Sequence, residues 1–136
     1  MAEHPTHIQF INPPTMSIPP GFTHVVEVTG GRTIYLSGQV AVDQSFQIVG
    51  KGDFRAQAEQ VFENLKAALA AVGADFTNVI KLNIYVVDMT NLPVLREVRD
   101  RYVNTHYPPA STAVEVSKLA FDDLLLEIEA VASLPA

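Results

Sequence analysis

Residues 78–87 read NVIKLNIYVV, and this stretch decides the fold because an apolar side chain recurs at every second position. Alternate side chains of a strand point to opposite faces, so one face of this segment would be apolar. The residues of that face are Ile80, Leu82, Ile84 and Val86. The alternation predicts a strand in a sheet that packs one face on a core.

Helices are predicted on both sides of this strand. Over residues 53–72 apolar side chains recur at spacings of three and four, with Asp53 placed to cap the start and Gly73 to end the helix. Residues 91–105 carry a second apolar stripe at the same spacing, and Asn91 is the expected cap. Two helices of this kind would cover one face of the sheet, which is an α+β arrangement.

The other strands are expected over residues 7–12, 22–29, 33–42, 111–119 and 124–133. Gly30 and Gly31 suit the turn of a hairpin between the second and third of these, and Gly38 indicates a bulge or a close backbone approach. The chain is thus expected to form one domain over residues 1–136, with a mixed sheet and two helices. Its first 21 residues would form a strand and a proline-rich loop.

The face of the sheet without helices is expected to be too apolar to lie in water. Val114 and Val116 are among the residues assigned to it, and apolar surface of this kind marks interaction sites. Charged residues also make up only 18% of the chain, below the ~25% of an average protein. Both features predict association of subunits.

Composition excludes several classes of protein. A chain of 136 residues has the length of one domain. Its net charge of −6 disfavours non-specific nucleic-acid binding, which needs a basic face, and the absence of cysteine excludes disulfides and thiolate chemistry. The start of the chain does not resemble a signal peptide, and no apolar run reaches the ~20 residues of a membrane span. A cytoplasmic protein without membrane attachment is therefore expected.

Standard catalytic motifs are absent from the sequence, and its four histidines lack the spacing of metal ligands, so neither a metal nor another cofactor is expected. Polar residues inside apolar strands carry more information. Ser37 and Gly38 interrupt one strand, and Glu127 and Glu129 interrupt another. Burying an unpaired carboxylate is costly. These glutamates therefore either point to the solvent side of the sheet, alternating with apolar neighbours, or serve a function.

Five segments of the chain form an ordered set. They are LSGQVAVD at residues 36–43, QA through NL at residues 57–65, VIKLNIYVVDM at residues 79–89, PASTAVEVSKL at residues 109–119 and EIEAVA at residues 127–132. Their order and spacing resemble the Rid family, the YjgF/YER057c/UK114 group of enamine and imine deaminases. The resemblance extends from about residue 22 to the end of the chain.

This resemblance implies a fold like that of chorismate mutase, a homotrimer with a barrel-like centre, and ligand pockets between subunits. It also implies site residues. Glu127 matches the glutamate that handles the attacking water in the deaminating members. Ser37 and Gly38 match a Ser-Gly pair of the pocket wall, and Phe22 matches an aromatic position that is commonly tyrosine. Ala113 is included among the residues expected to contact the small-molecule ligand.

One position departs from the family pattern. Deaminating members have a Pro-Ala-Arg-Ser motif whose arginine holds the substrate carboxylate, whereas Ser111 stands at that place in this chain. A guanidinium binds a carboxylate through two charge-assisted hydrogen bonds, and a serine offers one neutral donor. Loss of such a pair costs ~2–5 kcal/mol, or roughly 30- to 4,000-fold in affinity. Simple 2-imino acids are therefore expected to be poor ligands.

Two explanations are compatible with this departure. Arg96 falls at a pocket-rim position of the family and could supply the missing cation, although its neighbours Arg99 and Arg101 favour an ordinary exposed helix arginine. Alternatively, the substrate is neutral or lacks a carboxylate. A glutamate shielded from water beside Ser111 would suit a small imine, amide or carbonyl compound.

Two functions follow, and the sequence does not separate them. The first is deaminase-like hydrolysis of a small reactive imine, enamine or related nitrogen compound other than a simple 2-imino acid. The second is a non-catalytic trimer that binds a small metabolite. A ribonuclease, which is an older label of the family, is disfavoured because the chain is acidic and lacks a stripe of basic and aromatic residues.

Overall fold

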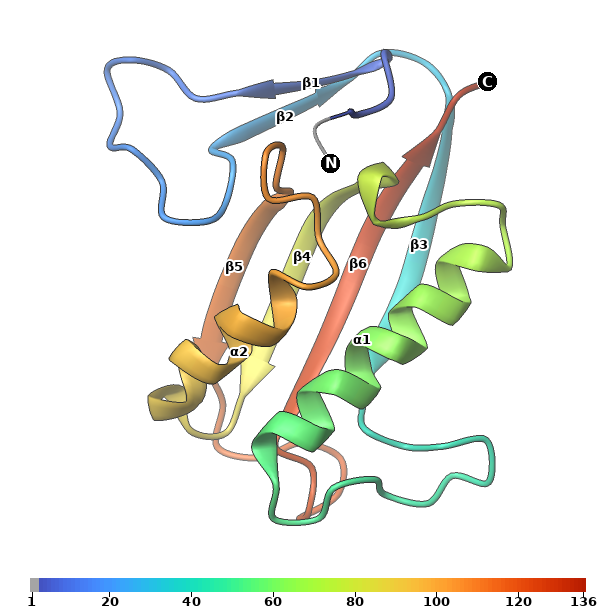
Figure 1. Ribbon diagram of the computed structural model, residues 1–136, viewed down its shortest axis with the longest axis vertical. Helices are drawn as coiled ribbons and strands as arrows, with labels where there is room; N and C mark the ends of the chain where they lie inside the picture. The colour runs from blue at the N-terminus through green and yellow to red at the C-terminus, as the bar shows by residue number, and fades with distance from the viewer. Residues whose placement is uncertain (1–2) are drawn as a thin grey trace.

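The computed structural model describes residues 3–136, so residues 1 and 2 of the expected domain lie outside it. It contains a four-stranded sheet, a separate two-stranded ribbon and two helices (Figure 1). The strands are β1 (Ile8–Ile11), β2 (Val25–Val28), β3 (Arg32–Gln39), β4 (Val79–Val86), β5 (Ala110–Glu115) and β6 (Leu126–Leu134). The helices are α1 (Phe54–Ala70) and α2 (Leu92–Arg99), and short 3-10 turns, η1 (Phe76–Asn78) and η2 (Met89–Asn91), precede β4 and α2.

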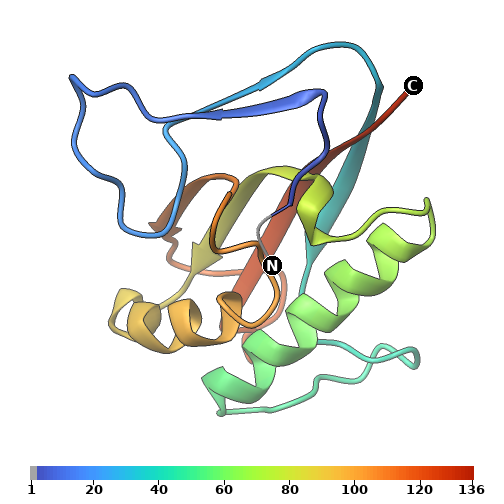
Figure 2. The ribbon, with the colours of Figure 1, turned by 45° about the horizontal axis from the view of Figure 1, so that its top comes forward.

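The main sheet has the strand order β3-β6-β4-β5 and is mixed. β4 runs parallel to β5 and antiparallel to β6, and β6 runs antiparallel to β3. Both helices lie on the same face of this sheet (Figures 1 and 2). The last strand of the chain therefore lies in the middle of the sheet, and the α+β prediction is confirmed.

Alternating side chains of the two central strands build the core. Leu82, Ile84 and Val86 of β4 are buried, as the sequence predicted, whereas Ile80 is only half-buried. The pairing of β4 with β6 is shifted between Val79 and Lys81, and this irregularity breaks the alternation at Ile80. The helix side of the core comes from the apolar stripe of α1.

The ends of α1 lie close to the predicted positions. The Asp53 side chain accepts a hydrogen bond from the backbone N–H of Ala56 at 3.1 Å, which caps the first turn. Gly73 adopts a φ of 76°, and the following N–H of Ala74 donates to the carbonyl of Leu69 at 2.9 Å. Both predicted end signals are therefore confirmed.

The predicted hairpin at Gly30 and Gly31 is wrong. β2 pairs with β1, and β3 pairs with β6, so the two glycines join strands of different sheets. At Gly31 the chain crosses the end of β6, where a β-carbon would overlap the carbonyl oxygen of Leu134. This close approach, with a positive φ, explains the glycine without a hairpin.

The second helix is shorter than predicted, since α2 ends at Arg99 and not near residue 105. Asn91 makes no capping hydrogen bond, and Asp88 instead accepts from the N–H of Thr90 in the preceding 3-10 turn. Beyond the helix, the buried Asn104 side chain accepts hydrogen bonds from the next backbone N–H groups, which fixes an irregular turn. β2 and β5 are also shorter than predicted.

Candidate functional site

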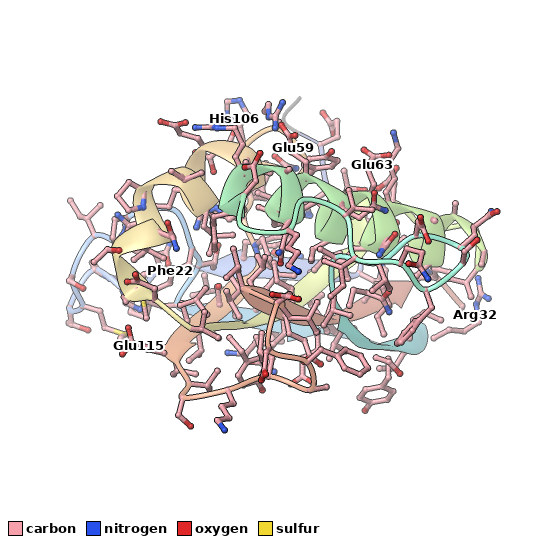
Figure 3. The ribbon with its side chains drawn as sticks, turned by 90° about the horizontal axis from the view of Figure 1, so that it is seen from below. Phe22, Arg32, Glu59, Glu63, His106 and Glu115 are labelled. Atoms are coloured by element: carbon pink, nitrogen blue, oxygen red, sulfur yellow. The ribbon has the colours of Figure 1, made fainter. Side chains whose placement is uncertain are left out.

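The helix-free surface of the main sheet, here called the open face, carries a row of polar side chains at its centre. Asn83 lies opposite Glu129 and Tyr85 lies opposite Glu127 in the pairing of β4 with β6. These positions alternate with the buried core residues, so their side chains point away from the helices. Figure 3 shows α1 and α2 together on the other side of the sheet.

The open face is less apolar than the sequence predicted. Tyr35 is 80% exposed and Val114 is 41% exposed, and both stand on the outer strands of the sheet. Between them lie the four polar residues of β4 and β6. Apolar side chains therefore flank a polar centre. Ligand-binding sites commonly combine an apolar lining with a few polar groups in this way.

Glu129 is held by two donors on a single oxygen. The side-chain Nδ2 of Asn83 donates to Oε1 of Glu129 at 3.0 Å, and the Tyr85 hydroxyl donates to the same oxygen at 2.9 Å. This hydrogen bond to Glu129, helped by desolvation and by the negative charges of Glu129 and Glu127, raises the pKa of Tyr85 above its usual value. The Tyr85 hydroxyl therefore stays protonated and acts as a donor near neutral pH.

Glu127 packs its carboxylate against the backbone of Gly38. A β-carbon at residue 38 would overlap Oε2 of Glu127, so only glycine leaves room for the carboxylate in this position. β3 bulges here, because Leu36 pairs with Ala130 and Gln39 pairs with Ile128. Both parts of the prediction for Gly38, a bulge and a close approach, are confirmed.

Two hollows open on this face, and Glu129 lines both. The first hollow has a volume of about 440 Å³ and lies between the strand residues Tyr85, Glu127 and Glu129 and the segment of residues 116–120. The second hollow, of about 260 Å³, contains Ser37 and Asn83. Within residues 3–136, Glu127 accepts no hydrogen bond from another side chain or from the backbone. Its carboxylate is therefore available to a ligand or a water in the first hollow.

The fold groups only part of the predicted site. Ser37, Gly38 and Glu127 come together on the open face. Ser111 and Ala113 pair with Leu82 and Ile84, whose side chains face the helices. Parallel partners share a face of the sheet, so these two residues and Glu127 lie on opposite faces of one chain.

Phe22 and Arg96 also lie away from Glu127. Phe22 is half-buried beside α2 (Figure 3). Its neighbour Thr23 donates its backbone N–H to the carbonyl of Pro109 at 3.2 Å, which brings Phe22 close to the start of β5. Arg96 is exposed on α2. The chain thus places Phe22 and Ser111 near the β5 edge of the sheet, whereas Glu127 lies in the middle of the open face.

Sequence reasoning did not assign four residues that the structure places around Glu127. The signal for Asn83 and Tyr85 was present, because both interrupt the apolar alternation of residues 78–87 two positions apart. Glu129 interrupts the apolar alternation of β6 in the same way, but the sequence assigns it no specific role. Lys118 of the first hollow had no local signal, because it lies in an irregular segment after β5.

Another hollow of about 440 Å³ lies on the helix side of the chain, between residues 75–77 and residues 100–105, and contains none of the residues that the sequence predicted for the site. Among residues 3–136, no group of three or more histidine, aspartate and glutamate side chains is arranged to hold a metal ion. No helix in the same range is long and apolar enough to cross a bilayer.

Comparison with known proteins gives consistent matches. A sequence model described as Endoribonuclease L-PSP matches residues 17–134. Protein DfrA of Myxococcus xanthus is 40% identical over 111 residues, which span 82% of this chain and 83% of that protein. The human 2-iminobutanoate/2-iminopropanoate deaminase is 36% identical over 101 residues, or 74% of this chain and 72% of the human protein.

A solved structure gives the same result for the fold. The Rid-family protein YyfB of Yersinia pestis, described as a protein of unknown function, superposes with a TM-score of 0.83 at 37% identity. The superposition covers 95% of this chain and all of the Yersinia chain.

Proposed function

The chain belongs to the Rid family, which the endoribonuclease L-PSP sequence model describes, and from this premise we propose that it hydrolyses a small reactive imine or enamine other than a simple 2-imino acid. The human relative is a 2-iminobutanoate/2-iminopropanoate deaminase, so imine hydrolysis is the reaction to consider first. The observation that carries the proposal is the Glu127 carboxylate, which lies against Gly38 in the first hollow without a hydrogen-bond partner in residues 3–136.

Glu127 would act as the base for the attacking water. The water oxygen forms a bond to the imine carbon, the electron pair of the C=N bond moves to nitrogen, and Glu127 takes the proton that the water loses. Return of this proton to the nitrogen gives a carbinolamine. Glu127 then transfers the hydroxyl proton of the carbinolamine to the nitrogen as the C–N bond breaks, which releases ammonia and leaves a carbonyl compound. A positioned general base of this kind contributes roughly 10²- to 10⁴-fold to a rate. Water and one carboxylate suffice, so the proposed reaction needs no cofactor.

The neighbouring polar residues would shape the site around this base. Tyr85 and Asn83 fix one oxygen of Glu129, so the wall beside Glu127 is preorganised. Ser37 lines the second hollow with Glu129 and offers a hydroxyl donor next to the Gly38 bulge. These contacts support a site for a ligand that carries both donors and acceptors.

We also propose that the complete site forms between subunits of a homotrimer. Ser111 and Phe22 lie near the β5 edge, and Glu127 lies on the open face, so one chain does not bring them to one ligand. A second copy that places its β5 edge against the open face would do so. The exposed side chains of Tyr35 and Val114 on that face support such a contact. Light scattering of the purified protein should give the mass of three chains, and a monomer would contradict the proposal.

The proposed substrate follows from Ser111. A single neutral hydroxyl replaces the guanidinium that would cancel the charge of a carboxylate bonded directly to the imine carbon. The site should therefore favour imines that do not depend on that anchor.

The test of this proposal is a comparison of turnover with binding. Imines without a carboxylate on the imine carbon are generated in situ from several amines by a flavin amine oxidase, and their decay is followed with the natural protein, with Glu127→Gln and with Glu59→Gln as a control. Glu59 lies on the outer side of α1 and pairs with Arg101, so its removal should not alter hydrolysis. Accelerated decay that is lost only in Glu127→Gln supports the enzyme. Ligand binding by both forms, with no acceleration by either, would contradict it and favour a metabolite-binding trimer.

A further inference from the structure

We propose that Lys118 determines the substrate of this site by binding an anionic group that the substrate carries away from its imine carbon. The proposal rests on imine hydrolysis at Glu127 and names the class of imine that the site takes. Its basis is the position of Lys118 across the first hollow from the two glutamates of β6.

The first hollow has two sides of opposite charge. Its floor is formed by β4 and β6 and presents the carboxylates of Glu127 and Glu129 with the Tyr85 hydroxyl. The opposite side is the segment that follows β5, and the one charged residue there is Lys118. Among residues 3–136, no other lysine or arginine lines either hollow of the open face.

The other cations are either engaged elsewhere or lie outside the hollow. Four of them form the ion pairs Lys51–Asp123, Arg55–Glu97, Arg99–Asp100 and Arg101–Glu59, and none of the ion pairs within residues 3–136 includes Lys118. Lys81 is on the open face but donates to the hydroxyl of Thr112 at 3.0 Å. Arg96 is exposed on α2, on the helix side of the sheet. Lys118 is therefore the cation best placed to meet a ligand beside Glu127.

The segment that carries Lys118 is held at both ends. Before it, the N–H of Val116 donates to the carbonyl of Val86 at 2.8 Å. After it, Phe121 packs edge to face on Phe46 at a centroid distance of 5.5 Å. Phe46 itself has a φ of 61°, a backbone conformation that a bulky residue rarely adopts. The backbone thus fixes Lys118 at the rim, while its exposed side chain can turn toward a ligand.

This arrangement favours a dipolar ligand. A protonated imine nitrogen would face the glutamates on the floor, and an anionic group would face Lys118 at the rim. A simple 2-imino acid has its carboxylate on the imine carbon itself, which would place both charges beside Glu127. A hollow of about 440 Å³ accommodates a longer molecule. The substrate class is therefore an imine with an acidic group at the far end of a short carbon chain.

The experiment compares two imines of equal size that differ in one charge. A flavin amine oxidase generates the imines of 5-aminopentanoate and of its amide, which lack a carboxylate on the imine carbon and end in a carboxylate and in an amide. The natural protein should hydrolyse the acidic imine with a KM roughly two- to fivefold lower, which is the effect of an exposed charge pair at the edge of a hollow. Lys118→Gln should abolish this preference by raising the KM for the acidic imine, with kcat unchanged. Lys81→Gln, from the same face, is the matched control and should keep the preference.

The proposal is overturned if the natural protein shows no preference for the acidic imine, or if the preference persists in Lys118→Gln. Failure of imine hydrolysis itself is a different result, because then neither imine decays faster with any form. In that case calorimetric titration with 5-aminopentanoate and with its amide, which share an ammonium group and differ in the far end, decides the role of Lys118. Tighter binding of 5-aminopentanoate that is lost in Lys118→Gln supports the anionic anchor, and equal binding or no binding of the two compounds overturns it.

Discussion

The two faces of the main sheet use the same strands for different purposes. On β6, Ile128 is fully buried beneath the helices, whereas Glu127 and Glu129 on either side of it reach the open face. On β4, Ile84 is buried between Asn83 and Tyr85, which point the other way. A shift of one residue would exchange the two sets. Stability therefore comes from the helix-covered face, which leaves the open face available for the chemistry that we assign to it.

The largest expected effect is loss of hydrolysis in Gly38→Ala. The added β-carbon overlaps the end of the Glu127 side chain, which can move aside, so stability should change by less than about 1 kcal/mol. Displacement of the carboxylate should lower kcat roughly 100-fold or more, as removal of a general base does. Imine hydrolysis and urea unfolding measure the two quantities.

Gly73→Ala is the control from the other region. Gly73 ends α1 with a φ of 76°, so alanine there should cost about 1 kcal/mol of stability and leave hydrolysis intact. Unchanged kcat in Gly38→Ala would show that the position of the Glu127 carboxylate against Gly38 is not needed for catalysis.

Ile128→Ala should give the largest loss of stability. Removing a fully buried branched side chain leaves a cavity and typically costs ~2–5 kcal/mol. Glu129→Gln, one position along the same strand, should change the free energy of unfolding by less than about 1 kcal/mol. Urea denaturation of both variants provides the measurement, and similar losses in the two would remove the distinction between the faces.

Local features of the fold could be predicted from the sequence. The apolar spacing of α1 and its end signals at Asp53 and Gly73 act within a few residues, so the helix was located closely. The alternation around Glu127 and Glu129 likewise predicted that both would point away from the core. Such signals depend on side-chain periodicity and on residues that favour caps and turns, and both can be recognised within a single segment of the sequence.

Strand partners and the composition of the site could not be predicted in the same way. β2 pairs with β1 and not across Gly30 and Gly31, because the end of β6 occupies the space beside Gly31. Ser111 faces the helices because of its register with Leu82, a long-range pairing without a local signal. Lys118 reaches the first hollow only through the tertiary position of an irregular segment.

A tyrosine on the helix-covered face makes the stability of that face depend on pH. Burial, with a hydrogen bond to Glu63, raises the pKa of Tyr102 to about 12. Because this value lies above that of the unfolded chain, the contribution of Tyr102 is fully present below about pH 10 and is lost as the pH rises toward 12. The urea concentration at the midpoint of unfolding should decrease as the pH is raised from about 8 to about 11 in the natural protein, and it should decrease less in Tyr102→Phe. An equal fall in both would contradict this assignment.

The smallest effect is expected from Tyr85→Phe on the open face. Tyr85 loses only its hydrogen bond to Glu129, so the unfolding midpoint should hardly move. The phenol absorbance of the natural protein should show Tyr85 titrating above its usual range, and Glu129→Gln should lower that pKa, since the Glu129 hydrogen bond is its main cause. An unchanged titration in Glu129→Gln would show that the two side chains do not interact in solution.

The most direct measurement of the central claim uses 2-iminopropanoate, generated in situ by an amino-acid oxidase, with the natural protein and with Ser111→Arg. We claim that the open face holds a working base in Glu127 and that the chain lacks only the anchor for a carboxylate on the imine carbon. Ser111→Arg should therefore hydrolyse this imine roughly 30-fold faster or more, and Glu127→Gln in the same background should abolish the gain. Equally rapid hydrolysis by the natural protein, or no gain in Ser111→Arg, would contradict the account.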